Sequence, residues 1–375
     1  MKKYLPAIGV LVMSCVTTAH AQSSVTLYGI VDTGIAYIHN VNGASSLWRQ
    51  QTSNLSGSEW GLKGREDLGG GLAAIFQLEN GFDVATGEAA QSSRLFGRQS
   101  FVGLASDVAG TFTLGRQYDP ISDLLQPITA DAFSGWFATP GDVDNYDSDA
   151  RFNNSVKWTS PGWGGFQGAL MYSFGGVAGA TGSGATYSAA LLWTAGNLSL
   201  AGGYLHIDNG NAVLGDRGTS SADTLFNTPV NAAYASARSI GIARLAAQYT
   251  IERLTAGVGY SYSLYAPDAS SSFTVSEKYH NGSVFLSYQF TPAFQIVGGY
   301  NYTRTTGDSA ATYHQANLGI DYSLSKRTDV YASAGYQHAS GENGSGVAEA
   351  SIGSFGYSAG KSTQEYALVG VRHRF

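Results

Sequence analysis

Residues 118–150 carry seven carboxylates and neither lysine nor arginine. The carboxylates are Asp119, Asp123, Asp131, Asp142, Asp144, Asp147 and Asp149. Because a connection this long in a compact fold is usually functional, and because rings of carboxylates select cations, we interpret the segment as a loop that narrows a pore. Asp119, Asp123 and Asp131 are expected to face the opening. The run 142–149 is expected nearer its mouth, and an external acidic loop that binds divalent cations is the alternative.

A basic counterpart is expected on the wall that faces this acidic segment. Glu59, Lys63 and Arg65 are separated by even numbers of residues, so they share one face of a strand. Trp60 and Leu62 occupy the other face. A charge that faces lipid costs about 2–4 kcal/mol at the membrane midplane, so we expect the charged face to line the lumen. Facing acids and bases would create a transverse field, although each cation could instead form a salt bridge that does not affect transport.

Enzyme chemistry is not predicted. The only cysteine, Cys15, lies in the N-terminal segment described next, so the rest of the chain has no thiol nucleophile, disulfide or thiolate ligand. None of the seven histidines lies in a recognisable catalytic motif, which disfavours a barrel hydrolase such as a lipase or protease. We therefore expect no enzymatic activity, no cofactor and no bound metal.

Residues 1–21 have the features of an export signal. Lys2 and Lys3 precede an apolar run over 7–16, and Ala19-His20-Ala21 forms a small-x-small cleavage pattern. The apolar run is too short for a membrane-spanning helix, which needs about 20 residues. Without the two lysines, the 21 basic residues fall to 19 against 27 acidic ones, so residues 22–375 form a single domain with a net charge of −8. That balance argues against nucleic acid as a partner.

Apolar and polar residues alternate with a period of two along most of the chain, which predicts β-strands. From Leu254 to Leu264, for example, the even positions are apolar or aromatic and the odd positions are Thr, Gly or Ser. Sixteen strands are predicted, at 25–39, 57–67, 72–82, 95–106, 110–117, 151–160, 165–174, 184–194, 198–207, 236–249, 254–265, 279–290, 294–304, 312–323, 329–338 and 364–375. The long polar connections between them are 40–56, 118–150, 208–235, 266–278 and 339–363.

Long strands joined alternately by short turns and long loops are typical of an outer-membrane barrel. We therefore predict an all-β fold, a transmembrane antiparallel β-barrel of about sixteen strands, with the segment 118–150 folded into the pore. An even strand number puts both ends of the domain on one rim. A secreted adhesive β-sandwich, which also alternates apolar and polar residues, is the alternative.

Eight stretches carry a family resemblance: 24–32 (SVTLYGIVD), 60–64 (WGLKG), 66–72 (EDLGGGL), 76–79 (FQLE), 97–104 (GRQSFVGL), 114–117 (LGRQ), 151–156 (RFNNSV) and 369–375 (VGVRHRF). Together they resemble the general porins of Gram-negative outer membranes, especially the betaproteobacterial branch. The resemblance implies a homotrimer embedded in outer-membrane lipid and lipopolysaccharide, with the third external loop in each lumen. It also implies that Phe375 is the signal read by the barrel assembly machinery. Arg98, Arg116 and Arg151 match the wall arginines of the family.

The expected function is passive diffusion of ions and small hydrophilic solutes across the outer membrane. The predicted constriction comprises Glu59, Lys63, Arg98, Arg116, Asp119, Asp123, Asp131 and Arg151. Many relatives have arginine where this chain has Glu59, which with the net charge of −8 predicts weak or slightly cation-leaning selectivity. A substrate-specific channel is the alternative. It is less favoured because tyrosines such as Tyr204 and Tyr260 fall on the apolar face, where lipid girdles lie.

Overall fold

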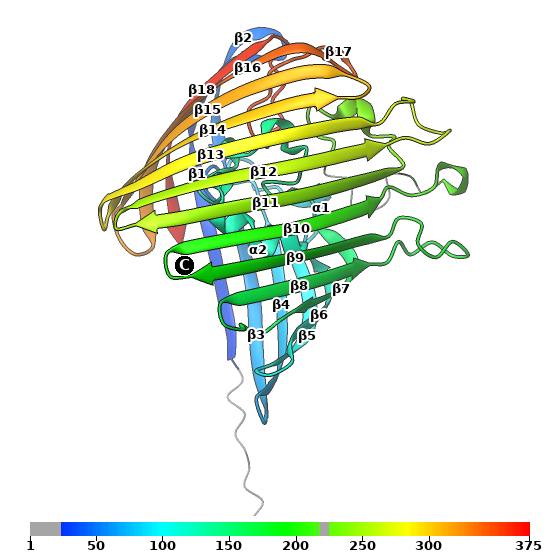
Figure 1. Cartoon of the computed structure of the whole chain (residues 1–375). Coiled ribbons are helices and arrows are strands. Elements are labelled where there is room, and N and C mark those ends of the chain that lie inside the picture. Colours follow the sequence, from blue (N-terminus) through cyan, green and yellow to red (C-terminus); the bar gives the residue numbers. More distant parts are fainter. Residues whose placement is uncertain (1–23, 216, 218–224) are drawn as a thin grey trace, which may run out of the picture.

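The computed structural model of the chain describes residues 24–215, 217 and 225–375 (Figure 1). The predicted signal peptide, residues 1–21, lies outside the described residues. The described strands are β1 Ser24–Val41, β2 Ala44–Thr52, β3 Glu59–Gly69, β4 Leu72–Gly81, β5 Gln99–Ser106, β6 Gly110–Gln117, β7 Phe152–Thr159, β8 Phe166–Ser173, β9 Thr186–Ala195, β10 Leu198–Asp208, β11 Ser239–Ile251, β12 Leu254–Ala266, β13 Glu277–Thr291, β14 Phe294–Thr306, β15 Ala310–Ser323, β16 Thr328–Asn343, β17 Gly346–Val347 and β18 Thr363–Arg374.

The helical elements are short. They are α1 Ala90–Ser93, α2 Pro120–Leu124, and the 3₁₀ turns η1 Gln126–Ile128, η2 Ala130–Ala132, η3 Gly135–Phe137, η4 Pro140–Asp142, η5 Ala212–Leu214 and η7 Ala232–Tyr234. Over the described residues, no helix has the length and apolar character needed to span a membrane.

The strands form one closed antiparallel barrel. β1 pairs with β18 from Ile30 opposite Arg374 to His39 opposite Glu365, which joins the first strand to the last. Among the described strands, β2 and β3 both pair with β1, one with each half of it, so together they occupy the place of one wall strand. The two-residue strand β17 pairs only with the end of β16. The wall therefore contains sixteen strands, which confirms the predicted fold and strand number.

The predicted long loop at 40–56 is wrong for residues 44–52. These residues form β2, which folds back on β1 so that Val41 lies opposite Ala44. The two residues between them, Asn42 and Gly43, both have positive φ, as a two-residue hairpin requires. The asparagine–glycine pair is thus a hairpin signal that the prediction overlooked.

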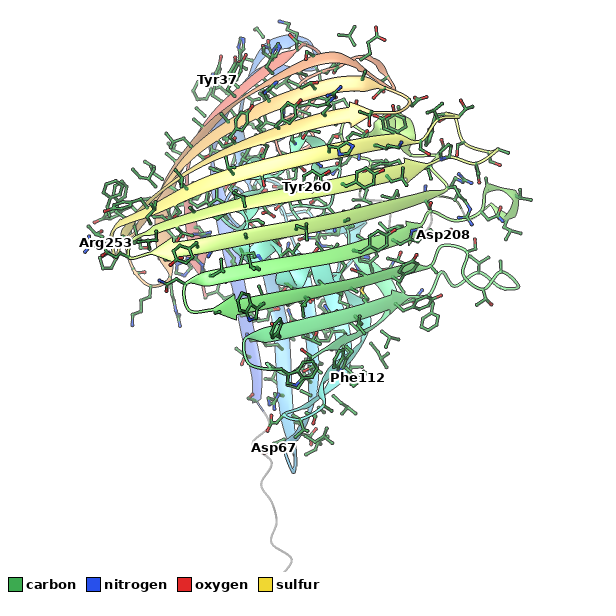
Figure 2. All side chains as sticks on the ribbon, viewed as in Figure 1. Tyr37, Asp67, Phe112, Asp208, Arg253 and Tyr260 are labelled. Atoms are coloured by element: carbon green, nitrogen blue, oxygen red, sulfur yellow. The ribbon has the colours of Figure 1, made fainter. Side chains whose placement is uncertain are left out.

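Side chains alternate between the two faces of the wall as predicted. On β12, Val258 and Tyr260 are exposed on the outer face, whereas Ser261 and Ser263 are buried on the inner face. Figure 2 shows apolar and aromatic side chains spread over the outside of the barrel, with Arg253 at the rim of short turns and Asp208 at the opposite rim. The apolar outer face is the one expected to meet lipid, because hydrocarbon disfavours charge.

We expect a charge on the outer wall to prevent stable insertion. Leu245 lies at the middle of β11 and its side chain is 63% exposed. Leu245→Arg should lower the free energy of unfolding by about 2–4 kcal/mol, as measured by urea unfolding in phospholipid vesicles. Gln248→Arg, on the inner face of the same strand, is the matched control and should have a much smaller effect. Equal losses for the two variants would contradict the assignment of the faces.

Candidate functional site

The segment between β6 and β7 runs inside the barrel, where α2 begins it. Asp119 caps this helix, because its carboxylate accepts hydrogen bonds from the Ile121 backbone N–H at 2.8 Å and from the Ser122 hydroxyl at 2.7 Å. Pro120 occupies the first helical position, where its missing N–H costs nothing. Capping and proline together explain why the chain turns into a helix directly after β6.

The first half of the segment is fixed to the inner wall by one ion pair and an apolar contact. The Lys157 ammonium of β7 lies 2.6 Å from the Asp123 carboxylate and donates a hydrogen bond to the Tyr118 carbonyl at 2.9 Å. Ile121 and Leu125 are buried in a hydrophobic cluster that includes wall residues of β8 and β10. These contacts hold α2 against the wall.

The middle of the segment, residues 136–138, is fixed by aromatic stacking and amide hydrogen bonds. The Trp136 ring stacks on Tyr366 of β18 and on Phe355, with centroid distances of 4.0 and 4.1 Å. The Gln315 side-chain amide of β15 donates to the carbonyl oxygens of Trp136 and Ala138. The loop carbonyls are buried and have no partner in the strand ladders, so a side-chain amide provides their hydrogen bonds.

A second inward segment, residues 53–58, lies between β2 and β3. The Asp32 carboxylate of β1 accepts hydrogen bonds from the backbone N–H groups of Asn54, Leu55 and Ser56, at 3.3, 2.8 and 2.9 Å. The Tyr331 hydroxyl of β16 donates to the same carboxylate. One buried carboxylate therefore holds three consecutive backbone donors, and the inward segment with them.

The two inward segments border two cavities inside the barrel. The first has a volume of 520 Å³ and is lined in part by Phe82, Gln91 and Ser354, which belong to connections at the rim of long loops. The second has a volume of 470 Å³ and reaches Thr255 and Arg374, near the short turns. The residues that line both cavities are Ser56, Pro127 and Ala132. These three residues form the boundary between the two cavities, which we call the waist.

On the wall side of the first cavity, Arg98 lies between two carboxylates. Its Nε is 2.6 Å from Glu59 and 2.8 Å from Glu79. Glu79 also accepts hydrogen bonds from the Tyr28 hydroxyl at 2.7 Å and from the Gln77 side-chain amide at 3.0 Å. The charge of the guanidinium is thus offset by two carboxylates on the same wall.

The same cavity contains a second arginine beside the loop. Arg151 donates to the Asp149 carbonyl at 2.7 Å and to the Tyr118 hydroxyl at 2.9 Å, and its guanidinium lies 4.9 Å from the centre of the Tyr118 ring. No carboxylate in the described part of the chain forms a salt bridge with it. Arg151 is therefore the cation of this cavity whose charge is least compensated.

The loop side of the cavity is acidic. Asp131, Asp147 and Asp149 line it, and the Ser354 hydroxyl donates to Asp147 at 2.5 Å. Burial, and then the nearby Asp149 carboxylate, raise the pKa of the Asp147 carboxyl to about 7, whereas Ser354, Arg151 and Arg98 oppose the shift. Burial also raises the pKa of Asp131 well above its ordinary value.

The structure brings together four of the eight predicted constriction residues: Glu59, Arg98, Asp131 and Arg151 all line the first cavity. It places the other four elsewhere. Asp119 is fully buried as the cap of α2, and Asp123, which is exposed, is paired with Lys157 of β7 and does not line this cavity.

Lys63 and Arg116 also lie away from this cavity. Lys63 is further along β3 toward the short turns, with its ammonium 5.0 Å from the centre of the Tyr28 ring. The pairing of β6 with β7 shifts register around Arg116, and its guanidinium donates to the Gly97 and Arg151 carbonyls and to the Asn153 side chain. A register shift of this kind cannot be read from strand alternation.

Several cavity residues were missed or misplaced by sequence reasoning. Asp147 and Asp149 line the same cavity as Asp131, although the run 142–149 was expected nearer the mouth. Asp142, from the same run, is buried. The inward segment 53–58 was also missed; its signal is the turn-rich run SNLSGS after a strand. No cluster of three or more potential metal ligands occurs in the described parts of the chain.

Comparison with known proteins now gives the family. A profile described as Gram-negative porin matches residues 7–342. An outer membrane porin protein of Bordetella pertussis is 30% identical, with 100% of each chain covered. The chain belongs to the Gram-negative porin family. As an outer membrane porin, it crosses that membrane with its strands.

Two solved structures share this porin's fold. One is titled as an anion-selective porin from Comamonas acidovorans, with a TM-score of 0.76, 24% identity, and coverage of 94% of this chain and 100% of that one. The other is OmpT of Vibrio cholerae in a trimer form, with a TM-score of 0.66, 18% identity, and coverage of 94% and 99%.

We expect Asp32→Ala to release the inward segment 53–58. Three buried backbone donors would lose a charged acceptor, which should lower the free energy of unfolding by about 2–3 kcal/mol. The freed segment should widen the passage, so single-channel conductance should rise and become noisier in planar-bilayer recordings. Asp67→Ala is the control, because Asp67 accepts only a local hydrogen bond from Gly69 in an exposed turn. Unchanged conductance in Asp32→Ala would contradict the assigned role.

Proposed function

We propose that this porin forms a water-filled channel for passive diffusion of ions and small hydrophilic solutes across the outer membrane. The observation that carries the proposal is the pair of polar cavities that share Ser56, Pro127 and Ala132 in their linings and reach toward opposite rims. Glu59, Arg98, Asp131 and Arg151 form the charged lining of the narrow part. Small hydrophilic solutes and ions are the partners that such a lining would admit.

A substrate-specific channel is the alternative, and it has less support. The lumen contains an aromatic stack around Trp136, but Trp136 and Tyr366 are almost fully buried. Buried rings cannot guide a sugar along the passage. The relatives found are named as porins, which also favours a channel over a barrel enzyme.

We further propose that the channel is a homotrimer in outer-membrane lipid and lipopolysaccharide, inserted by the barrel assembly machinery. The trimer form of the Vibrio cholerae structure supports the stoichiometry. Phe375 is exposed on the outer face, next to the closing seam of the barrel, where an assembly factor can reach it. The yield of folded protein in outer membranes after deletion of Phe375 tests that role.

A cysteine at the waist tests whether ions pass there. The predicted mature chain contains no cysteine, so Ser56→Cys would introduce a unique thiol. A charged methanethiosulfonate reagent should then reduce the current in planar bilayers, in three steps for a trimer. Val258→Cys, on the outer wall, is the matched control and should be unaffected. Wild-type protein that inserts without any current would refute the channel, and an unblocked Ser56→Cys channel would refute this route.

The selectivity proposed for this channel is weak and slightly cation-leaning. Glu59, Asp131, Asp147 and Asp149 line the first cavity, against two cations, Arg98 and Arg151. Because burial raises the pKa of Asp131 and Asp147, the four carboxylates carry less negative charge than their number. The remaining excess of negative charge above pH 7 supports only a weak preference for cations, and the Comamonas acidovorans porin of the same fold is titled anion-selective.

Lowering the pH from 8 to 6 should reduce this cation preference. The pKa of Asp147 is raised to about 7, so its carboxylate is mostly charged at pH 8 and mostly neutral at pH 6. One unit charge about 8 Å from a permeating ion changes ion occupancy roughly two-fold in water, and the reversal potential in a salt gradient should shift accordingly.

Asp147→Asn should remove this part of the pH dependence and should resemble the wild type at pH 6. Asp107→Asn, in an exposed turn, is the control and should keep the wild-type profile. A clear anion preference of the wild type at pH 8 would contradict the proposed selectivity. An unchanged pH dependence of the reversal potential in Asp147→Asn would exclude Asp147 as the titrating group.

A further inference from the structure

A short part of the inward loop between β6 and β7 is held in a strained backbone conformation. We call residues 142–149 the acidic turn. Three of its residues have positive φ angles of 49°, 51° and 61°, namely Asp142, Asn145 and Ser148. Residues other than glycine rarely adopt this conformation, and it persists only where surrounding contacts fix it. The position of the turn matters because Asp147 and Asp149 line the first cavity.

A row of three polar side chains on the inner wall holds the turn. The register places Arg244 of β11 opposite Ser261 of β12, and Ser261 opposite Asn281 of β13; the three strands lie side by side in Figure 1. Ser261 and Asn281 both donate to the Asp144 carboxylate, the latter at 3.3 Å. Arg244 Nη1 donates to the carbonyl of the next residue, Asn145, at 3.1 Å. Strands that the barrel keeps in place thus hold two consecutive residues of the turn.

Arg244 also packs against the residue that follows. Its guanidinium lies 4.2 Å from the centre of the Tyr146 ring, within the range of a cation–π contact, and the Tyr146 hydroxyl lies 3.2 Å from that of Ser283 on β13. Arg244 is 2% exposed, and in the described part of the chain it forms no salt bridge. A buried charge is costly without partners. The hydrogen bond and the ring contact that stabilise this one both come from the acidic turn.

The burial of Arg244 separates its role from that of a pore-lining cation. Its side chain lines neither of the two cavities, so a permeating ion does not touch it. Asp147 directly follows Tyr146, and a shift of the Tyr146 ring would therefore move the Asp147 carboxylate in the first cavity. Arg244 can thus change the charge that an ion meets only by way of the turn.

We propose that Arg244 is a positioning residue for ion selectivity, which holds the acidic turn so that Asp147 and Asp149 face the first cavity. This inference rests on the proposed function and deepens it, because it assigns part of the selectivity to a side chain that no ion contacts. Without the guanidinium, the turn would relax from its strained conformation, and the two carboxylates would leave the cavity.

The sign of the change in selectivity distinguishes positioning from a direct effect of charge. Removal of a positive charge alone should raise the cation preference. Loss of two carboxylates from the cavity should lower it, because each unit charge about 8 Å from a permeating ion changes ion occupancy roughly two-fold in water. Two lost carboxylates outweigh one lost guanidinium, so Arg244→Gln should lower the cation-to-anion permeability ratio about two-fold. Reversal potentials in a salt gradient at pH 8 measure this ratio.

Two substitutions of Tyr146 test the same contact without a change of charge. Tyr146→Leu removes the ring and should lower the ratio, whereas Tyr146→Phe keeps the stacked ring and should retain most of the wild-type ratio. Arg238→Gln is the matched control for charge. Arg238 precedes β11 and lies 2.7 Å from Asp208 at the rim of long loops, so its loss should not lower the ratio.

Hydrogen exchange of the folded protein in detergent reports on the turn independently of conduction. The backbone N–H groups of Asp147 and Ala150 donate to the side chains of Asp142 and Asn145, at 2.8 and 2.9 Å. In Arg244→Gln and Tyr146→Leu these two amides should exchange about ten-fold faster, as loss of a hydrogen bond to a charged group implies. The amides of β12 should keep their wild-type rates.

An unchanged or raised permeability ratio in Arg244→Gln would overturn the proposal. A lowered ratio that Tyr146→Leu does not share, an equal loss in Arg238→Gln, or unchanged exchange of the turn would also overturn it. If Arg244→Gln does not insert, the comparison of Tyr146→Leu with Tyr146→Phe decides. Wild-type protein that conducts no ions would instead refute the proposed function, and the exchange rates would still show whether Arg244 holds the turn.

Discussion

Hydrocarbon offers no hydrogen-bond partners, so every backbone N–H and C=O of a membrane-spanning sheet must be satisfied within the sheet itself. The porin meets this requirement through the pairing of β1 with β18, which extends to Phe375, whose N–H donates to the Gly29 carbonyl at 3.0 Å. Once the sheet is closed, each strand has one face toward lipid and one toward the lumen. Charged groups are then confined to the lumen, the loops and the headgroup level, and every site discussed above follows from that confinement.

A closed barrel of sixteen strands is too wide for wall side chains to fill, so the chain must narrow its own lumen. Two segments do so, and both bring backbone polar groups into the interior. The strand ladders cannot satisfy those groups, and side chains do it instead: Asp32 accepts three N–H groups, and the Gln315 amide donates to two loop carbonyls. The width of the passage therefore depends on a few buried polar side chains as much as on the length of the loop.

The alternation of residues predicted the fold and the strand number, because a period of two is a local property of each strand, and the length and acidity of residues 118–150 identified the long inward loop. The alternation also assigned Glu59 to the lumen. The same reasoning failed where contacts between distant segments decide the outcome. Asp119 and Asp123 were indistinguishable from Asp131 as residues of an acidic loop, yet Asp119 caps α2 and Asp123 pairs with a lysine of β7. The hairpin at Asn42-Gly43 had a local signal, whereas the docking of 53–58 on Asp32 had none.

The charge of the narrow part differs from a simple opposition of basic wall and acidic loop. Arg98 is the wall cation at the first cavity, and Glu59 and Glu79 both lie within 2.8 Å of it. Both carboxylates pair with this one guanidinium, so the glutamate at position 59 offsets the basic side of the field. Arg151 then provides the remaining positive charge, and it projects from the base of the acidic loop itself. An arginine that is paired with two carboxylates cannot act alone as the basic side of a transverse field, so the wall of the first cavity offers little means of aligning a dipolar solute.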